Sequence, residues 1–310
     1  KVGHGWGLCM NPELLREGRA VEDFRVPDRI VVGATDSMTA EVFLNVYADF
    51  TCPKLVTTPR TAEMIKYVSN SLLATMISFS NEIGNMCSAV PGVDARLVWK
   101  GVHLDRRLTP INGQVGGAAG VTEYLWHGLG FGGSCFPKDV AALRSFGRTV
   151  GEQTRMLDAV LDINADQPLR MVALLEKELS LAGKTVAVLG LAFKPGTDDL
   201  RESPALPLVA ELRKKGAKVL VHDPIAMPHA KKRPEFRDVV FAEDWAEALR
   251  KSDACCLVTA WPEYRNIQPT NFQKLMTRAL VIDGRGVFEP AAMAAAGVVW
   301  RGVGYTPEST

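Results

Sequence analysis

The stretch from Thr185 to His222, TVAVLGLAFKPGTDDLRESPALPLVAELRKKGAKVLVH, sets the fold of the C-terminal part of the chain. Its short apolar runs at 185–189 and 218–222 predict buried strands, and the pattern from Pro204 to Lys215 predicts a helix between them. The same alternation continues, with a helix expected at 244–251 and strands at 239–241, 254–258, 279–283 and 298–301. Strands that alternate with helices predict a Rossmann-like, doubly wound parallel sheet.

Ligands of a doubly wound sheet bind beyond the carboxyl ends of its strands. In this sequence those positions are GLAFKPG (190–196), HDP (222–224) and DGR (283–285). We therefore expect the binding residues of the C-terminal region in these three loops.

Helical patterns dominate the region before this sheet. The segment Arg60–Ile83 contains neither Gly nor Pro and repeats apolar residues at helical spacing, and Thr58 followed by Pro59 predicts where its helix starts. A second helix is expected from Pro137, and a long helical run from Glu152 to Leu181. Long helices with apolar residues on more than one side often pack against a second copy, so we expect a homodimer through this region.

The opening region has α/β character. It predicts a strand at Arg29–Ala34, a helix at Asp36–Tyr47 capped by Asp36, and a strand at Lys54–Thr58. These elements are too few for an open sheet with a core of its own. The chain is thus expected to be an α/β protein in three parts: the remnant of a first Rossmann domain (1–58), a helical central domain for dimerisation (59–182), and the Rossmann-like sheet (183–310).

Composition narrows the class of protein. Hydrophobic residues make up 47% of the chain and charged residues 23%, which excludes a disordered protein. Lys and Arg number 36 against 35 Asp and Glu, so no nucleic-acid partner is indicated. Neither a membrane-spanning apolar run nor the apolar core of a signal peptide occurs, and we expect a cytoplasmic protein without a membrane partner.

The six cysteines predict neither a metal site nor a disulfide framework, because no two of them form a C-x-x-C pair. Five are interpreted as small buried hydrophobic residues, among them Cys255 and Cys256 in an apolar strand. Cys135 differs, because it follows a Gly-rich loop and precedes the start of a helix. A helix N-terminus and the nearby Lys138 favour a thiolate, so Cys135 is the candidate nucleophile; a buried structural cysteine is the alternative.

The loop before Cys135 reads Gly128-Leu-Gly-Phe-Gly-Gly133 and formally matches the dinucleotide fingerprint G-x-G-x-x-G. That fingerprint should follow a buried strand and open a βαβ unit, whereas EYLWH precedes this loop and a helix follows it. We interpret it instead as a flexible loop that delivers Cys135.

Lys66 and Asn70 lie four residues apart and hence on one face of the long helix. An ammonium and a carboxamide in this arrangement can hold a water or stabilise an oxyanion. The alternative is a pair of solvated surface side chains, the usual state of such residues on helices.

Five strings carry a resemblance to a known family: NPELLREG (11–18), PDRIVVG (27–33), AEMIKYVSN (62–70), GFGGSCFPKD (130–139) and GLAFKPGTDDLRES (190–203). Together they resemble the UDP-glucose/GDP-mannose dehydrogenase family, over about 11–304 and nearest to its UDP-glucose members. The resemblance implies a four-electron oxidation of a sugar C6 hydroxyl to a carboxylate, with two NAD molecules used in turn. Among the possible substrates it favours UDP-glucose, which would become UDP-glucuronate. The alternative is a non-catalytic nucleotide-sugar-binding or regulatory protein derived from such an enzyme.

The resemblance also implies roles for individual residues. Cys135 would form a thiohemiacetal and then a thioester; Lys66 and Asn70 would stabilise oxyanions, and Asp139 and Glu13 would serve proton transfer and hydrolysis. Substrate contacts would come from Glu17, Arg107 (which reaches a partner subunit's site), Gly132, Lys194, Arg201 and Arg285. Lys138 would contact the cofactor. The first and last parts of the chain would then be an NAD-binding remnant and a UDP-sugar-binding domain.

The sequence departs from the family pattern in two places. It begins near the end of the NAD-binding domain, so on the order of 100 residues and most of the NAD site are expected to be missing, and the chain by itself is expected to be inactive. The Gly-rich stretch Leu108–Thr122 is longer than the matching family loop, which affects the expected substrate contacts more than the chemistry.

Overall fold

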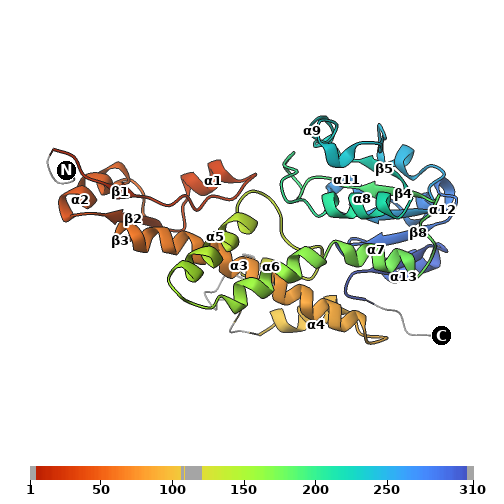
Figure 1. Ribbon diagram of the computed structural model, residues 1–310, viewed down its shortest axis with the longest axis horizontal. Coiled ribbons are helices and arrows are strands. Elements are labelled where there is room, and N and C mark those ends of the chain that lie inside the picture. Colours follow the sequence, from red (N-terminus) through yellow and green to blue (C-terminus); the bar gives the residue numbers. More distant parts are fainter. Residues whose placement is uncertain (1–4, 106–107, 109–120, 306–310) are drawn as a thin grey trace. The chain divides into compact units, whose positions relative to one another are not determined.

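The computed structural model describes residues 5–105, 108 and 121–305. Arg107 and most of the Gly-rich stretch at 108–122 lie outside the described residues. The chain divides into two compact units, residues 1–72 and 73–310, and each is described by itself (Figure 1). The division expected from the sequence, at 58 and 182, stays a prediction about domains.

The first unit is built on a three-stranded sheet in the order β1-β2-β3. Its elements are β1 (Cys9–Met10), α1 (Ala20–Arg25), β2 (Ile30–Ala34), α2 (Ser37–Val46) and β3 (Lys54–Thr57). Strand β2 pairs antiparallel with β1 and parallel with β3. Asp36 caps α2 by accepting a hydrogen bond from the Thr39 amide at 2.8 Å, as the sequence predicts.

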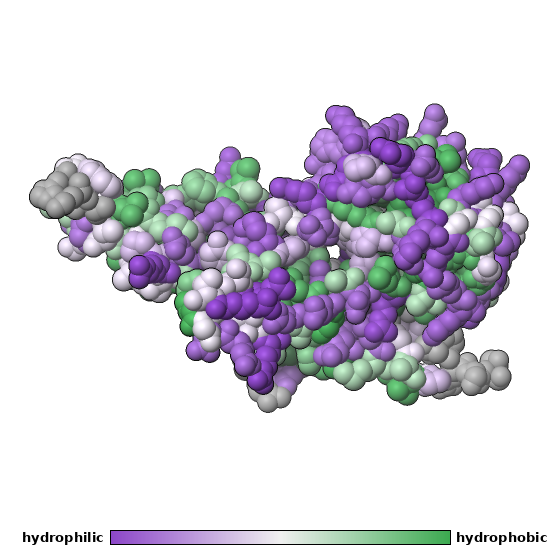
Figure 2. Space-filling view, in the orientation of Figure 1, coloured by the Kyte–Doolittle hydropathy of each residue, from purple (hydrophilic) through white to green (hydrophobic). Residues whose placement is uncertain are grey.

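Only a small core supports this sheet. Ile30, Val32 and Ala40 form its fully buried part. Large hydrophobic side chains of α1 and α2 face outward, and Figure 2 shows green patches over these helices. The expectation that these elements have no core of their own is therefore wrong, although this core is too small to bury most of the apolar surface of the unit.

Helix α3 (Pro59–Ser88) begins where Thr58 and Pro59 predict. The Thr58 hydroxyl accepts a hydrogen bond from the Thr61 amide at 3.3 Å. A Cβ on Gly33 would lie 2.6 Å from the Ala62 Cβ and 2.8 Å from the Pro59 Cα. Glycine is therefore required at position 33, because β2 and the first turn of α3 lie in direct backbone contact.

The helical part of the second unit follows α3. It contains α4 (Ala95–His103), the 3₁₀ turn η1 (Thr122–Tyr124), α5 (Phe136–Thr149), α6 (Arg155–Asp166) and α7 (Leu169–Glu176). The single run expected at 152–181 is wrong: it is split at Gln167 and Pro168, because proline lacks the amide needed inside a helix. Within the described part of the chain, no helix is both long and apolar enough to cross a membrane; the cytoplasmic location stays a prediction.

The remainder of the second unit is a six-stranded, all-parallel sheet in the order β6-β5-β4-β7-β8-β9. The strands are β4 (Thr185–Leu189), β5 (Lys218–His222), β6 (Val240–Phe241), β7 (Ala254–Leu257), β8 (Leu280–Asp283) and β9 (Val299–Gly302). This order is the doubly wound arrangement predicted from the sequence, and its switch point lies between β4 and β7.

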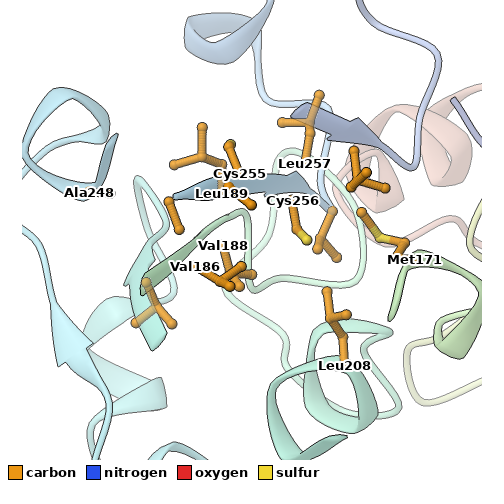
Figure 3. Packing of buried hydrophobic residues seen from close by; sticks show 14 of the residues in the cluster. Met171, Val186, Val188, Leu189, Leu208, Ala248, Cys255, Cys256 and Leu257 are labelled. Carbon is orange, nitrogen blue, oxygen red and sulfur yellow. The ribbon is translucent and has the colours of Figure 1, made fainter. Parts of the chain in front are cut away.

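Helices cover both faces of this sheet. They are α8 (Ala205–Lys214), α9 (Met227–Ala230), α10 (Trp245–Leu249), α11 (Pro262–Arg265), α12 (Pro269–Leu275) and α13 (Pro290–Ala295), with a 3₁₀ turn η2 (Pro234–Phe236). Figure 3 shows Cys255 and Cys256 of β7 beside Leu189 of β4, with Leu208 of α8 and Met171 of α7 in the same core. Right-handed crossovers on either side of the switch point place helices on opposite faces.

The expected burial of five cysteines is confirmed for three of them. Cys87, Cys255 and Cys256 are buried, and burial raises the pKa of the Cys256 thiol well above its ordinary value. Cys9 and Cys52 are only half-buried, because they belong to the first unit with its small core. All six cysteines are free thiols.

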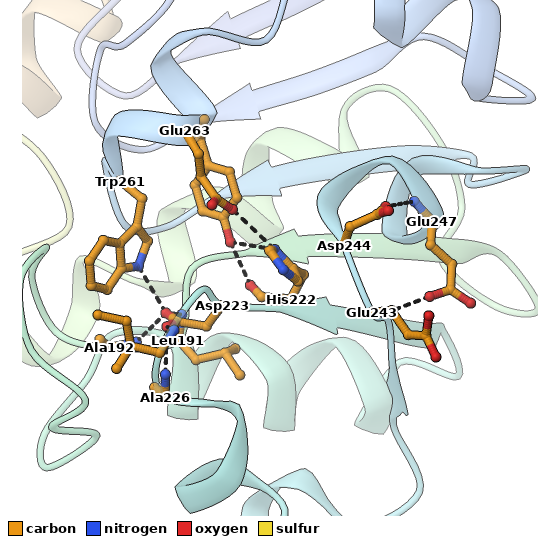
Figure 4. A network of polar contacts seen from close by, with 12 residues as sticks. Leu191, Ala192, His222, Asp223, Ala226, Glu243, Asp244, Glu247, Trp261 and Glu263 are labelled. Atoms are coloured by element: carbon orange, nitrogen blue, oxygen red, sulfur yellow. Dashed lines mark hydrogen bonds and ion pairs between the residues drawn. The ribbon is translucent and has the colours of Figure 1, made fainter.

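Asp223, directly after β5, fills the anion position at the switch point. One carboxylate oxygen accepts from the amides of Leu191 and Ala192 at 2.7 and 3.0 Å and from the Trp261 indole at 3.0 Å (Figure 4). The other oxygen accepts from two amides of the following turn, at 3.0 and 2.8 Å. This buried carboxylate thus joins the ends of β4, β5 and β7.

We expect Asp223→Ala to lower the free energy of unfolding by about 3 kcal/mol or more, because several buried N–H groups would lose their acceptor. Urea denaturation measures this change. Asp162→Ala, which removes an exposed carboxylate, is the control and should change stability by less than about 0.5 kcal/mol. Equal stability of the two variants would contradict the importance of the Asp223 network.

Candidate active site

Cys135 occupies the N-cap position of α5, and its side chain is exposed. Its carbonyl accepts the first helical hydrogen bond, from the Asp139 amide at 2.8 Å. The Ser134 hydroxyl lies 3.6 Å from the Cys135 sulfur. The thiol is thus at a helix N-terminus, as expected, and it can be reached from solvent.

Asp139 lies one turn further along α5 and is 1% exposed. The exposed Lys138 ammonium approaches its carboxylate at 2.5 Å. A buried carboxylate needs such a partner, because desolvating an unpaired charge is costly. This pair and the thiol therefore share the first turn of one helix.

Side-chain amides form hydrogen bonds with the backbone of the Gly-rich loop. Asn164 of α6 accepts from the Phe131 amide at 2.7 Å and donates to the Phe131 carbonyl at 3.0 Å. Asn81 of α3 accepts from the Gly128 amide at 2.7 Å, and Gln167 donates to the Gly128 carbonyl at 2.7 Å. The expectation of a flexible loop is therefore wrong: residues 128–131 are fixed by directed hydrogen bonds.

The same loop packs on its other side against loops of the parallel sheet. A Cβ on Gly132 would lie 2.3 Å from the Glu202 carbonyl oxygen and 2.9 Å from the Phe193 Cβ. The Gly133 amide donates to the Arg201 carbonyl at 2.8 Å. The glycines at 132 and 133 are therefore explained by close packing, and within the described residues 121–127 no strand leads into the loop as a dinucleotide turn would need.

Three cationic candidates lie on the loops that follow β4 and β8. Lys194 sits over the Phe193 ring, 5.4 Å from its centroid, and Arg201 makes a bidentate ion pair with Asp199. Arg285 donates to the Val258 carbonyl at 2.7 Å, and burial lowers the pKa of its guanidinium to about 10. These loops are the ligand-binding positions expected from the strand order.

The first unit holds the other candidates. Lys66, on α3, donates to the Glu13 carboxylate at 3.2 Å, and the Leu15 amide donates to the other oxygen of Glu13. Asn70 follows Lys66 by one helical turn, and Glu17 follows Glu13 in the same segment. Lys66 is mostly buried and paired, so the alternative of a freely solvated lysine does not describe it.

Sequence reasoning missed the amide side chains that hold the loop. Asn164 and Gln167 are three residues apart, so they face the same side, and Asn81 is fully buried on a helix with exposed hydrophobic residues. A polar residue inside an otherwise apolar helical pattern was the available signal. It does not tell which backbone groups the amide would bind.

Models of the UDP-glucose/GDP-mannose dehydrogenase family match the chain in three places. The NAD-binding domain matches residues 1–51, the central domain 60–166 and the UDP-binding domain 187–290. A UDP-glucose 6-dehydrogenase of Rickettsia conorii is 37% identical over 97% of this chain and 68% of its own length. The chain belongs to the UDP-glucose/GDP-mannose dehydrogenase family.

Two further comparisons agree with this assignment. A UDP-glucose 6-dehydrogenase of Haloferax volcanii is 42% identical over 93% of this chain. The solved structure of a UDP-glucose dehydrogenase from Pyrobaculum islandicum is 41% identical and superposes with a TM-score of 0.84 over 97% of this chain. The chain spans 64% of the length of each of these two members of the UDP-glucose/GDP-mannose dehydrogenase family.

The first unit lacks, among residues 5–51, the features that bind the phosphates of a dinucleotide. In the first unit, Thr35 and Asp36 connect β2 to α2. The Asp36 carboxylate accepts a hydrogen bond from the Thr39 amide at the start of α2, so this amide is not open to a phosphate. No glycine fingerprint follows a strand within residues 5–51. The described residues of the first unit therefore do not by themselves form a dinucleotide site.

His127, immediately before the loop, gives a testable pH dependence. Burial lowers the pKa of His127 to about 4, and its Nδ1 has no hydrogen-bond partner among the described residues. The unfolded chain takes up this proton near pH 6.5 and the folded chain only near pH 4, so stability falls as the pH is lowered between these values.

We expect the parent chain to lose about 2 kcal/mol more stability between pH 7 and pH 5 than His127→Asn does, because the variant lacks the titrating ring. Urea unfolding at the two pH values measures the difference. An identical loss in both proteins would show that His127 does not carry this dependence.

Proposed function

We propose that this chain supplies the nucleophile and the nucleotide-sugar-binding parts of an NAD-dependent oxidation of UDP-glucose to UDP-glucuronate. One observation carries the proposal: an exposed thiol at a helix N-terminus directly follows a loop that packs against the expected nucleotide-binding loops. Family membership supports the reaction class, and the names of the relatives support UDP-glucose among the possible sugars. The three-part domain division and the cytoplasmic location are part of the same proposal.

Cysteine chemistry explains how one site can oxidise an alcohol twice. The C6 hydroxyl first loses a hydride and a proton and becomes an aldehyde, which is a poor hydride donor. The Cys135 thiolate then bonds to the aldehyde carbon, and the resulting thiohemiacetal oxyanion expels a second hydride and becomes a thioester. Water cleaves the C–S bond and releases the carboxylate and the thiol. The family resemblance assigns both hydrides to NAD, and the residues of this chain act on the sugar carbon.

The remaining catalytic roles follow the family resemblance. We assign oxyanion stabilisation and water placement to Lys66 and Asn70, and hydrolysis to Glu13, with which Lys66 is paired. We assign to Asp139 the transfer of a proton through the water molecule that Lys66 and Asn70 place. Its burial beside Lys138 supports a carboxylate held in a fixed orientation.

Binding roles rest on the loops that follow the strands. We assign the nucleotide diphosphate and the sugar to Lys194, Arg201 and Arg285, with Gly132 giving close backbone approach and Glu17 supporting the site. Arginine and lysine are the side chains that best bind phosphate oxygens. Arg107, assigned to a partner subunit's site, and Lys138, assigned to the cofactor, complete the set of expected contacts.

Calorimetric titration and an NADH assay together test this function. Cys135→Ser should bind UDP-glucose with the micromolar affinity that we expect of the unaltered chain. NADH formation by the gene product that carries this substitution should fall at least about 10³-fold, because no thioester can form. GDP-mannose should bind more weakly, and this chain should not bind NAD measurably.

Cys52→Ser, which alters a half-buried thiol of the first unit, is the matched control and should keep both properties. Full activity of Cys135→Ser would overturn the nucleophile assignment. UDP-glucose binding by the gene product with no NADH formation before any substitution would support the alternative of a non-catalytic binding protein.

A homodimer through the central helical region is the second part of the proposal. Helix α3 exposes about half of each of four large hydrophobic side chains, which share one stripe of the helix by their spacing: Val68, Leu72, Phe79 and Met86. A monomer rarely leaves such a stripe in water. A second copy of the chain would bury it.

Phe79→Asp should therefore convert a dimer into a monomer, because it places a charge in the apolar contact. Sedimentation equilibrium measures the mass. Glu82→Lys, on the exposed surface of the same helix, is the control and should leave the mass unchanged. A monomeric parent chain, or a dimeric Phe79→Asp, would contradict this interface.

A further inference from the structure

The position of Cys135 depends on groups that are distant from it in sequence. The thiol comes two residues after Gly133, and residues 128–133 are held from two sides. On one side are the side-chain amides of Asn81 in α3, Asn164 in α6 and Gln167. On the other side are the loops after β4 and β8. The family resemblance assigns no role to Asn81, Asn164 or Gln167, which make the contacts on the helical side.

We infer that Asn164 and Gln167 are positioning residues, which hold the Gly128–Phe131 backbone so that Cys135 stands at the start of α5. This inference rests on the proposed function of Cys135. Asn164 is suited to the role, because its carboxamide binds both the amide and the carbonyl of Phe131, at 2.7 and 3.0 Å. A carboxylate or an aliphatic side chain cannot make both bonds.

Gln167 provides the second fixed point. Its amide nitrogen donates to the Gly128 carbonyl at 2.7 Å, and its amide oxygen accepts from Asn85 at 3.1 Å, which orients the group. Gln167 is fully buried. Its backbone is still helical, and it follows Asn164 by three residues, so it faces the same side as Asn164 and reaches the loop.

Packing by Phe131 and Leu129 completes the arrangement. The Phe131 ring belongs to the core between α3, α5 and α6, beside Ala74, Val140 and Val160. Leu129 lies in the sheet core, and a Cβ on Gly284 would lie 2.5 Å from it. Successive side chains of the loop thus insert into two different cores, so moving the loop costs contacts in both.

Hydrogen exchange tests the fixed loop in the unaltered chain. The amides of Gly128, Phe131 and Gly133 should exchange slowly, because Asn81, Asn164 and the Arg201 carbonyl accept their hydrogen bonds. In Asn164→Leu the Phe131 amide should exchange rapidly. Rapid exchange of all three amides in the unaltered chain would overturn the inference without any variant.

The functional consequence is measured in a graded series. Asn164→Leu should lower kcat of the gene product by about 100-fold with a smaller change in KM, since misplacement of a reacting atom by about 1 Å costs this much. The kcat of Asn164→Asp, which keeps only the acceptor for the Phe131 amide, should lie between those of Asn164→Leu and the parent.

Alkylation of Cys135 by iodoacetamide at pH 7 should slow about two- to fivefold in Asn164→Leu, as the thiol leaves the helix terminus. Gln167→Met should change both rates in the same direction.

Ser78→Ala is the matched control, because it removes a buried hydrogen bond between α3 and α6, to the Val160 carbonyl at 2.9 Å, without touching the loop. It should lower stability but leave the Cys135 alkylation rate and kcat within about twofold of the parent. Equal effects of Ser78→Ala and Asn164→Leu would overturn the inference. If Cys135→Ser is inactive while Asn164→Leu keeps the parent kcat and alkylation rate, the positioning role fails and the proposed function stands; an active Cys135→Ser shows the reverse failure.

Discussion

Two sets of contacts on one short loop hold the backbone that leads to Cys135. The loop 128–133 has few side-chain atoms, so its backbone groups are open to partners on both sides. Amides from the helical region take its polar groups, and the loops after β4 and β8 pack against its glycines. Because the thiol follows this loop by two residues, we infer that the position of Cys135 depends on the helices and on the sheet at the same time.

Two carboxylates accept hydrogen bonds from backbone amides beyond the ends of strands. Asp223 fills the amide groups at the switch point of the parallel sheet, and Asp36 caps the helix after β2. A helix terminus or an amide pair that already binds a carboxylate has little remaining attraction for another anion. In the proposed function, recognition of a nucleotide diphosphate therefore falls to cationic side chains on the loops, of which Lys194, Arg201 and Arg285 are the candidates.

Helix α3 shows an unusual distribution of side chains. Ser78 and Asn81 are buried, while Phe79 and Met86 are about half exposed. The buried polar groups are used in contacts with α6 and with the loop, which explains why they are inside. The exposed hydrophobic stripe has no such explanation among the described residues, and it is the physical basis of the proposed dimer.

Sequence alone determined the elements that depend on local chemistry. The strands of the parallel sheet, the caps Asp36 and Thr58, and the position of Cys135 before a helix all follow from hydrophobic period and terminal residues, which neighbours in the chain decide. Only the tertiary structure decided that residues 128–133 are fixed, that Gln167 meets the loop, and that Lys66 is paired with Glu13. These features join groups tens of residues apart, and local propensity holds no information about which distant backbone atom a buried amide or ammonium will meet.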